Sequence, residues 1–459
     1  MQFGAPIPPI LREIQALRSL GVGRLVVQAL VTGGIAGAVI GLFRQAYTWI
    51  NAATVSVIRA HNLSDPVVWL GIFAILCLLA LAAWLLLRYE ALISGSGIPQ
   101  VELSVAGQMP MRWSSVLWAK FVGTLVSLTG GVSVGREGPC IQMGAAVGCG
   151  VGHIWHAAPH TMPRYLIGGS VAGLTAAFGA PIAGLCFAFE EMKTVLSAPL
   201  LLFTAVIAAS AWFVVQVLFD FGFVFPFQNT AVLMPLQWWI VPLAGVITGI
   251  LGALYNTLLI RVTLWADTCP KRLQPLRVLS PFLLSGILLY VFPQVLVGFG
   301  PDAVLLETFP LPLSALLLLL AVKILFSCAS FASGVAGGLL MPMLLSGALT
   351  GACTATALLA LQCIEPNQSG TLLLLCMAGL FAATVRAPLT GAALLLEMTG
   401  SLANAPAALA TAFLAALVAN WLHSPPVYDS LKQRILRQKK AQQTPTAATE
   451  QQTAPLRRY

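Results

Sequence analysis

Apolar residues fill this chain in long runs, and each run is about as long as a membrane helix, which needs roughly 20 residues. Polar and charged residues fall mostly between these runs or after the last one. This pattern predicts an all-α polytopic membrane protein. The predicted crossings are residues 25–50, 66–88, 115–135, 165–190, 197–219, 236–260, 277–298, 311–327, 343–362, 370–396 and 403–422.

Three segments rich in glycine and proline interrupt the helical pattern: Ser94–Pro99, Gly135–Pro139 and Gly334–Pro342. Irregular backbone at membrane depth is tolerated only where it lines a cavity or is buried in protein. Each break also leaves a helix N-terminus with unpaired N–H groups and a positive dipole end. Several such ends at one point would bind an anion weakly enough to release it, which transport requires.

An internal repeat divides the apolar region. Ala180-Pro181 leads to Glu190-Glu191-Met192, and Ala387-Pro388 leads to Glu397-Met398; the first glutamate follows the proline by nine residues in both. Gly/Pro-interrupted segments in corresponding places of two halves indicate a transport site near the bilayer midplane. Glycine and proline are common in membrane helices, but that alone does not explain the shared spacing. The spacing leaves open whether the halves are parallel or inverted.

The repeat suggests a division of the chain into five parts. We expect an N-terminal cytoplasmic segment, a first transmembrane half, a loop between the halves, a second transmembrane half and a basic cytoplasmic tail that is partly disordered from about Gln442. Their boundaries are 1–24, 25–219, 220–235, 236–428 and 429–459.

Composition agrees with a membrane protein. The chain is 58% hydrophobic and 8% charged, with a mean hydropathy of +0.89. The net charge of +9 comes largely from the tail, and arginines also precede the first apolar run. The positive-inside rule then places both termini in the cytoplasm of a multi-pass inner (plasma) membrane protein. A basic tail can bind nucleic acid, but we favour anionic lipid as its neighbour and expect no nucleic-acid partner.

Neither a cofactor nor a metal is expected. The nine cysteines form no C-x-x-C pair, and the histidine cluster of His153, His156 and His160 lacks a further ligand. The sequence has no H-E-x-x-H or G-x-S-x-G motif, so an enzyme is the least favoured class.

Glu137 is the candidate functional residue that stands out first, because a carboxylate at membrane depth needs a partner, an ion path or water. It could occupy the dipole-lined position itself and exclude an anion until a proton neutralises it. The alternative is an ion pair with Arg136, although neighbouring helical residues do not face each other. Ser96 supplies a hydroxyl donor to the same site or, alternatively, caps a helix.

Glu191 is the second acidic candidate. Only Glu190 has a counterpart in the repeat, namely Glu397, so we assign this pair to the shared architecture. Glu191 is then available for a task specific to one half, such as relaying protons. The alternative is an exposed charge at a helix end beside Lys193.

Taken together, Gly95-Ser96-Gly97-Ile98-Pro99, Gly135-Arg136-Glu137-Gly138-Pro139, the repeated A-P…E-M segments and the late Tyr428 resemble the CLC family of chloride channels and proton-coupled chloride exchangers. The resemblance covers roughly residues 25 to 435. It implies an all-helical homodimer in which each subunit has a pore made from two inverted-topology repeats, with broken helices around a midplane anion site. The absence of a nucleotide-sensing domain pair looks like the bacterial branch.

The resemblance also implies roles for single residues. Ser96 and Tyr428 match the hydroxyl donors of the central anion site, Glu137 the external gating glutamate and Glu191 the internal proton-transfer glutamate. Arg136, Lys120 and Glu102 match supporting charges. The family's G-x-F-x-P segment, whose backbone N–H groups bind the anion, reads Gly338-Leu339-Leu340-Met341-Pro342 here, with leucine where phenylalanine is usual.

The resemblance predicts exchange of chloride for protons, because Glu137 and Glu191 occur together. Ser96 favours chloride over nitrate, and fluoride-specific relatives usually differ in this segment. The alternative is a passive, voltage- or pH-gated chloride channel, since Leu340 could loosen the inner gate. The expected partners are chloride, protons, membrane lipid and a second copy of the chain.

Overall fold

The computed structural model describes residues 21–61, 65–193, 197–227, 230–291 and 311–452. Among these residues every secondary-structure element is a helix. Extended pairing is limited to two isolated bridges, Gly95 with Ala336 and Gly135 with Gly338. The all-α expectation is therefore confirmed. The predicted N-terminal segment 1–24 lies almost entirely outside the described residues.

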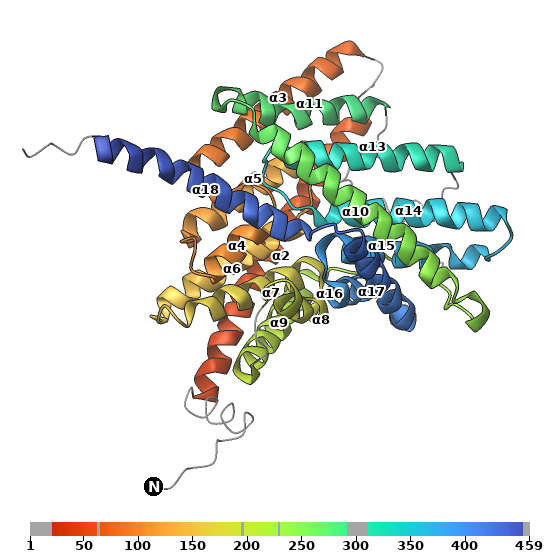
Figure 1. Cartoon of the computed structure of the whole chain (residues 1–459), viewed down its shortest axis with the longest axis horizontal. Coiled ribbons are helices and arrows are strands. Elements are labelled where there is room, and N and C mark those ends of the chain that lie inside the picture. The colour runs from red at the N-terminus through yellow and green to blue at the C-terminus, as the bar shows by residue number, and fades with distance from the viewer. Residues whose placement is uncertain (1–20, 62–64, 194–196, 228–229, 292–310, 453–459) are drawn as a thin grey trace, which may run out of the picture.

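The helices follow one another in the order shown in Figure 1. In the first part of the chain they are α2 (Val22–Ala60), α3 (Pro66–Tyr89), η1 (Ala91–Ile93), α4 (Ile98–Val105), α5 (Trp113–Thr129), α6 (Glu137–Ile154), α7 (Met162–Phe178), α8 (Pro181–Glu190) and α9 (Ala198–Phe219). In the second part they are η2 (Pro235–Gln237), α10 (Ile240–Asp267), η3 (Lys271–Leu273), α11 (Gln274–Val291), α13 (Leu313–Ala332), α14 (Leu340–Ala360), η5 (Pro366–Gln368), α15 (Ser369–Val385), α16 (Pro388–Thr399), η6 (Leu402–Asn404), α17 (Ala405–Trp421) and α18 (Val427–Gln452).

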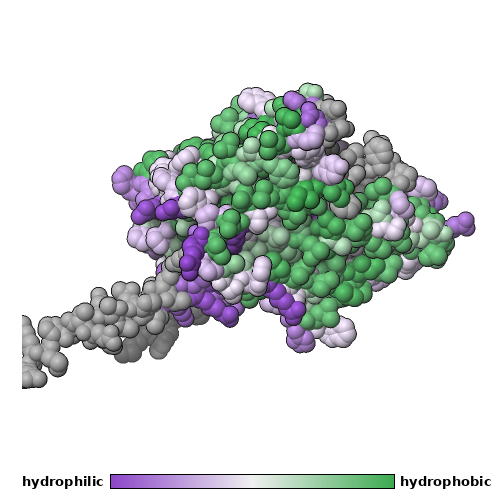
Figure 2. All heavy atoms as spheres, turned by 90° about the horizontal axis from the view of Figure 1, so that it is seen from above, coloured by the Kyte–Doolittle hydropathy of each residue, from purple (hydrophilic) through white to green (hydrophobic). Residues whose placement is uncertain are grey.

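Nine spans among the described residues are long and apolar enough to cross a membrane. They differ in how much of each span the rest of the protein covers: about 22% of an 18-residue stretch in α3 is buried inside the protein, against 94% of such a stretch in the span that contains α15. Figure 2 shows hydrophobic residues over most of the middle of one face, with hydrophilic residues towards its edges. A surface of this kind is stable against lipid tails rather than water.

Two predicted crossings are each broken into two helices. The run 165–190 breaks after α7, where Gly179 is left-handed with φ of 70°, and Pro181 begins α8. The run 370–396 breaks in the same way after α15, where Arg386 has φ of 72° and Pro388 begins α16. A left-handed residue ends a helix and a proline starts the next, so these breaks were readable from local sequence.

Helix α6 (Glu137–Ile154) was missed as a separate apolar run. Five glycines and several small residues give it a modest hydropathy, yet all but its last turn is buried. Its glycines allow close packing on α7: a Cβ added at Gly144 would lie 2.2 Å from the carbonyl oxygen of Gly169, and one at Gly173 would lie 2.2 Å from that of Cys140. Small residues that bring backbones together are typical of helix pairs in membranes.

The repeated glutamates hold helices α8 and α16 together by a reciprocal contact. The carboxylate of Glu190, at the end of α8, accepts hydrogen bonds from the N–H groups of Leu389 and Thr390 at the start of α16, at 3.0 and 2.7 Å. Glu397, near the end of α16, accepts from the N–H groups of Ile182 and Ala183 at the start of α8, at 3.0 and 2.8 Å. Each helix end is thus capped by the equivalent residue of the other half, as a two-fold relation requires.

Helix α18 packs against α4, α10 and α15 and then extends away from the body of the molecule (Figure 1). Lys432 bonds Glu102 at 2.6 Å, and Arg434 bonds Asp267 at 2.5 and 2.6 Å. The helix continues to Gln452, although the composition predicted disorder from about Gln442. Alanine, glutamine and glutamate are good helix formers, which accounts for the difference.

Candidate functional site at the junction of broken helices

The three interrupted segments meet at one junction. The N–H of Gly95 donates to the carbonyl of Val335, and the N–H of Gly337 donates back to the carbonyl of Gly95, both at 3.1 Å. Gly135 and Gly338 exchange two backbone bonds of 2.7 and 2.6 Å. Helices α4, α6 and α14 each begin two or three residues after one of these bonds. Their N-termini therefore start from a common junction, as the sequence predicted.

Glycine is required where these backbones approach each other. A Cβ added at Gly138 would lie 2.8 Å from the carbonyl oxygen of Ser96, and one at Gly338 would lie 3.0 Å from the nitrogen of Gly138. Gly97 has φ of 88°, and its Cβ would meet the side chain of Gln142 at 2.3 Å. Glycine alone combines this conformation with this proximity. The contacts bring the first turns of α4, α6 and α14 together.

Glu137 is the first residue of α6 and is fully buried. Its two carboxylate oxygens accept no well-formed hydrogen bond from the described residues, and the nearest cationic atom is Arg136 Nε at 3.8 Å. The ion pair that the sequence offered as an alternative is therefore present, but it is long. A buried carboxylate with so little direct support is held mainly by its helix N-terminus.

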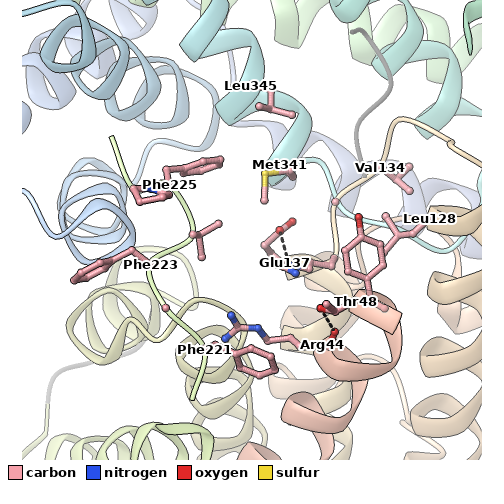
Figure 3. Close-up of a pocket in the computed structure, with 16 residues that line it drawn as sticks. Arg44, Thr48, Leu128, Val134, Glu137, Phe221, Phe223, Phe225, Met341 and Leu345 are labelled. Carbon is pink, nitrogen blue, oxygen red and sulfur yellow. Dashed lines mark hydrogen bonds and ion pairs between the residues drawn. The ribbon is translucent and has the colours of Figure 1, made fainter. Parts of the chain in front are cut away.

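Two cavities adjoin the junction, and we name them outer and inner after the external and internal positions that the family resemblance implies for Glu137 and Glu191. The outer cavity, of about 330 Å³, is lined by residues that include Arg44, Tyr47, Arg136, Glu137 and Phe221 (Figure 3). The inner cavity, of about 220 Å³, is lined by residues that include Ser96, Phe331, Leu431 and Arg434. Glu137 faces one cavity and Ser96 the other, while Gly138 touches Ser96 between them.

Ser96 is 2% exposed and sits just before α4. Its hydroxyl oxygen accepts a long hydrogen bond of 3.4 Å from the N–H of Ile98, so the capping role is present but weak. The buried ammonium of Lys120 donates to the carbonyls of Ile93 and Gly95 at 2.7 and 2.6 Å. Lys120 thus fixes the loop that carries Ser96.

Tyr428 stands at the start of α18 and is 2% exposed. Its hydroxyl has no hydrogen-bond partner among the described residues. Buried tyrosine hydroxyls usually find a partner. A group left without one is available to donate to a bound ion.

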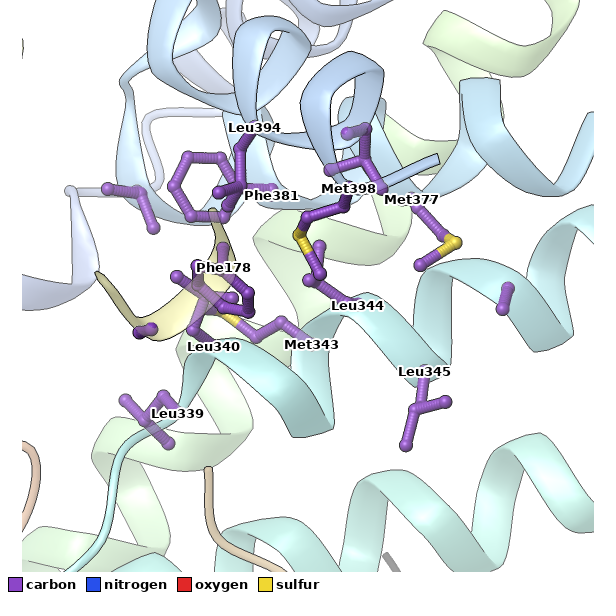
Figure 4. Close-up of a cluster of buried hydrophobic side chains, with 14 of the residues drawn as sticks. Phe178, Leu339, Leu340, Met343, Leu344, Leu345, Met377, Phe381, Leu394 and Met398 are labelled. Carbon is purple, nitrogen blue, oxygen red and sulfur yellow. The ribbon is translucent and has the colours of Figure 1, made fainter. Parts of the chain in front are cut away.

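The backbone N–H groups of residues 338 to 340, which were predicted to bind the anion, differ in whether they are already hydrogen-bonded. The N–H of Gly338 is already bonded to the carbonyl of Gly135, so it is not available to an anion in this conformation. Leu339 caps α14 and Leu340 begins it, where N–H groups have no preceding turn to bond to. The side chain of Leu340 is 4% exposed and belongs to the buried cluster that includes Phe178 and Phe381 (Figure 4).

Glu191 is buried at 6% exposure and follows the last residue of α8, so it is not the exposed charge of the alternative reading. Charges from four nearby groups act on it, namely Glu102, Lys193, Asp429 and Lys432. All four are joined by three ion pairs: Lys193 with Asp429 at 2.6 Å, Asp429 with Lys432 at 3.2 Å, and Lys432 with Glu102 at 2.6 Å. Glu191 therefore lies beside a charged network that α18 completes.

Three residues of these sites were not singled out from the sequence. Arg44 was one charge within an apolar run, and the signal that identified Glu137, an ionisable group at membrane depth, applied to it equally. Asp429 and Lys432 were read as part of a tail that sets orientation. Only the three-dimensional contact of α18 with α4 shows that Lys432 bonds Glu102, and Asp429 joins them through Lys432.

Among the described residues, no group of three or more histidine, cysteine, aspartate or glutamate side chains could hold a metal ion. His153 instead bonds the backbone carbonyl of Cys149 through Nδ1 at 2.8 Å.

Comparison with known proteins gives a consistent result. The family model described as "Voltage gated chloride channel" matches residues 78–420. The chain is 32% identical over 439 residues to the H(+)/Cl(-) exchange transporter ClcA of Vibrio parahaemolyticus, and 34% identical over 437 residues to that of Vibrio cholerae strain M66-2. The alignments cover 91% of both chains in the first case and 90% of both in the second.

Solved structures agree with this fold. A slow cyanobacterial Cl−/H+ antiporter superposes with a TM-score of 0.84 at 29% identity, over 91% of this chain and 99% of that one. A eukaryotic CLC transporter superposes with a TM-score of 0.75 at 20% identity, over 90% of this chain and 74% of that one, and so supports the fold alone. With its family model matched across most of the chain and the predicted junction of broken helices in place, this chain belongs to the voltage gated chloride channel, or CLC, family.

Proposed function

We propose that this protein exchanges chloride for protons across the membrane. The observation that carries the proposal is the position of Glu137, a fully buried carboxylate at the junction of α4, α6 and α14 that lines one of the two cavities found there. A second support comes from relatives over 90% of the chain that are named as H(+)/Cl(-) exchange transporters.

In the proposed mechanism, Glu137 and chloride compete for the same dipole-lined position. While ionised, the carboxylate fills that position and blocks the path between the cavities. A proton that binds Glu137 removes its charge, and chloride then takes the place near the N-termini of α4 and α14. Ser96, Tyr428 and the N–H groups of Leu339 and Leu340 would hold the ion from the inner side.

Glu191 is the proposed proton donor and acceptor on the inner side. It is buried close to the start of α18, and its neighbours include both acidic and basic groups. Protons that reach Glu191 from the inner face would pass to Glu137, while chloride moves the opposite way. Chloride and protons would then share only the central position.

The test is the variant Glu191→Gln in liposomes loaded with chloride. The account predicts that chloride efflux continues while proton uptake driven by the chloride gradient disappears, because only the proton path loses its titratable group. Glu365→Gln, a change at an exposed loop, serves as a matched control and keeps both fluxes. Proton uptake that persists in Glu191→Gln would show that this residue is not the relay.

A passive channel is the second candidate, because Leu340 stands where the family usually has phenylalanine. The buried position of Leu340 among large side chains argues for a closed inner packing rather than a gap (Figure 4). Chloride flux far above transporter turnover in the wild-type protein, with no proton movement, would favour the channel.

The proposal includes the cellular setting. We infer a homodimer in the inner (plasma) membrane with both termini in the cytoplasm, supported by family membership and by the basic residues of α18. Protease protection of a tag after residue 459 in right-side-out vesicles tests the orientation, and light scattering of the purified protein in detergent tests the subunit number.

A further inference from the structure

Arg44 is a buried cation that has no acidic partner among the described residues. It lies in α2, within one of the spans long enough to cross the membrane, and is 5% exposed. Its Nη1 donates to the carbonyl of Ala176 at 2.9 Å, its Nε has no hydrogen-bond partner, and no described carboxylate forms an ion pair with it. A buried charge in this setting is costly unless an opposite charge reaches it.

The guanidinium of Arg44 lies at the wall of the outer cavity. Its central carbon is 3.8 Å from the ring centre of Phe221, which belongs to the segment after α9 (Figure 3). This stacking and the bond to Ala176 fix the guanidinium in one place. Arg136, also on the cavity wall, lies 5.7 Å from the ring centre of Tyr47, and its Nε likewise has no hydrogen-bond partner.

The charges around the outer cavity do not balance. Arg44 and Arg136 contribute two positive charges, and Glu137 contributes one negative charge at 3.8 Å from Arg136. Because Glu137 pairs with Arg136, the charge of Arg44 is left without a carboxylate partner among the described residues. When a proton neutralises Glu137, Arg136 loses its counter-charge too.

We propose that Arg44 and Arg136 form an anion-binding site in the outer cavity, one step outside Glu137, that takes a small monovalent anion of the halide class. Its role as an entry site for chloride rests on the proposed function. The cavity of about 330 Å³ has room for an anion with several waters, each of which occupies about 30 Å³ in the liquid. An anion that keeps part of its hydration exchanges rapidly, as an entry site requires.

The chemistry of the site favours capture over tight binding. A guanidinium is weakly hydrated and spreads its charge over a plane, and here part of that plane faces the ring of Phe221. A cleft lined by one sign of charge with apolar walls raises the local concentration of counter-ions. Removal of Arg44 should therefore reduce the rate at which anions arrive from the outer side and leave the steps beyond Glu137 intact.

A direct test uses bromide as the probe in crystals of the full chain. The site predicts an anomalous bromide peak between Arg44 and Arg136 in the wild-type protein, and its loss in Arg44→Gln while the fold and any bromide nearer Ser96 remain. A wild-type outer cavity that holds no bromide, or a peak that persists in Arg44→Gln, would overturn the proposal. This readout does not depend on proton coupling, so it fails or succeeds separately from the proposed function.

A second test measures uptake of labelled chloride into right-side-out and inside-out membrane vesicles. Arg44→Gln should raise the half-saturating chloride concentration about tenfold in right-side-out vesicles only, and added impermeant salt should shrink the difference. Arg44→Lys, which keeps the charge, should recover most of the effect. Equal half-saturation for wild type and Arg44→Gln on the outer side would contradict the proposal.

The matched control is Arg88→Gln. Arg88 also lies over an aromatic ring, 5.1 Å from that of Trp84, and its side chain is exposed at the end of α3 outside the cavity. It should leave the half-saturating concentration unchanged in both vesicle types. A shift as large as that of Arg44→Gln would mean that the effect comes from net charge and not from the cavity.

Discussion

At the scale of single residues, the junction depends on side chains whose usual partners are missing. Glu137 accepts no well-formed hydrogen bond, and the hydroxyl of Tyr428 donates none among the described residues. Buried polar groups of this kind are costly in a protein interior, so their persistence points to a ligand or to a moving proton. Both groups lie near the first turns of helices, where an anion is stabilised.

The variant Glu137→Gln tests the competition directly. Glutamine keeps the shape of the side chain but carries no charge and takes up no proton. We expect chloride binding to tighten by about tenfold, since a carboxylate no longer excludes the ion. Proton movement driven by chloride should stop, and the remaining chloride flux should lose its dependence on pH.

Isothermal titration of chloride into the purified protein measures the first effect, and a proton-sensitive dye in liposomes measures the second. Gln142→Glu is not suitable as a control, because the side-chain amide of Gln142 donates a hydrogen bond to the backbone carbonyl of Leu92 and the change would remove that bond. Glu365→Gln, which changes an exposed carboxylate at the start of η5, is the better control and should retain coupling. A Glu137→Gln protein with normal coupling would refute the role given to this carboxylate.

Whether the sequence alone could identify a functional residue depended on the local sequence around that residue. Glu137 and Ser96 stand in glycine-rich motifs that disturb an apolar run, so they were identified before the structure. Arg44 lies in a regular helix, and Asp429 acts through a contact with Lys193 that joins distant parts of the chain. No local pattern records such contacts.

At the scale of helices, the reciprocal caps of α8 and α16 tie the two halves together. The equal spacing from proline to glutamate predicted that Glu190 and Glu397 play the same part. It did not show that each caps the helix of the other half, because spacing within one segment carries no information about its partner. The helix breaks at residues 179–181 and 386–388 are different, because the prolines that begin α8 and α16 are local signals, yet both breaks lay inside runs predicted as single crossings.

Glu397→Gln should destabilise the contact by about 1–2 kcal/mol, since two charge-assisted bonds to a helix N-terminus become neutral ones. Glu190→Gln should behave alike, with an added loss from its bond to the hydroxyl of Thr390. Thermal unfolding in detergent measures both changes. Asp65→Asn, at the exposed cap of α3, is the control and should change little, because asparagine caps as well as aspartate.

The reciprocal arrangement would be refuted by a clear asymmetry. If Glu397→Gln unfolds at the wild-type temperature while Glu190→Gln does not, the two glutamates do not play equivalent parts and the cap of α8 is not needed.

At the scale of the whole molecule, the sequence predicted the fold class and the family because both rest on long apolar runs and on motifs with fixed spacing. The docking of α18 was not predicted. It joins the end of the chain to α4 through Lys432 and Glu102, and to α10 through Arg434 and Asp267. These pairs join positions that are far apart along the chain, so neither helix shows them alone.

The docking of α18 should weaken in acid. Burial raises the pKa of Asp429, but hydrogen bonds and charges from Lys193 and Lys432 outweigh it, so the pKa lies below its ordinary value. The docked form is therefore favoured while Asp429 is ionised, above about pH 4, and the advantage is lost as the pH falls through the lowered pKa. Hydrogen exchange of residues 429–440 between pH 3 and 6 should show faster exchange at the acid end.

Asp429→Asn provides the comparison, because it removes the titrating group and keeps the size of the side chain. It should exchange faster than wild type at pH 6 and show a smaller change on acidification. An unchanged acid midpoint in Asp429→Asn would assign the transition to another group, such as Glu102.

The central claim, that chloride and proton movements are coupled through Glu137 and Glu191, is tested most directly by the reversal potential of the wild-type protein in liposomes. With a fixed chloride gradient, the pH outside is changed and the voltage at which chloride flux stops is measured. The account predicts that this voltage shifts with the pH gradient, because each cycle moves both ions. A voltage that follows the chloride gradient alone, whatever the pH, would contradict it.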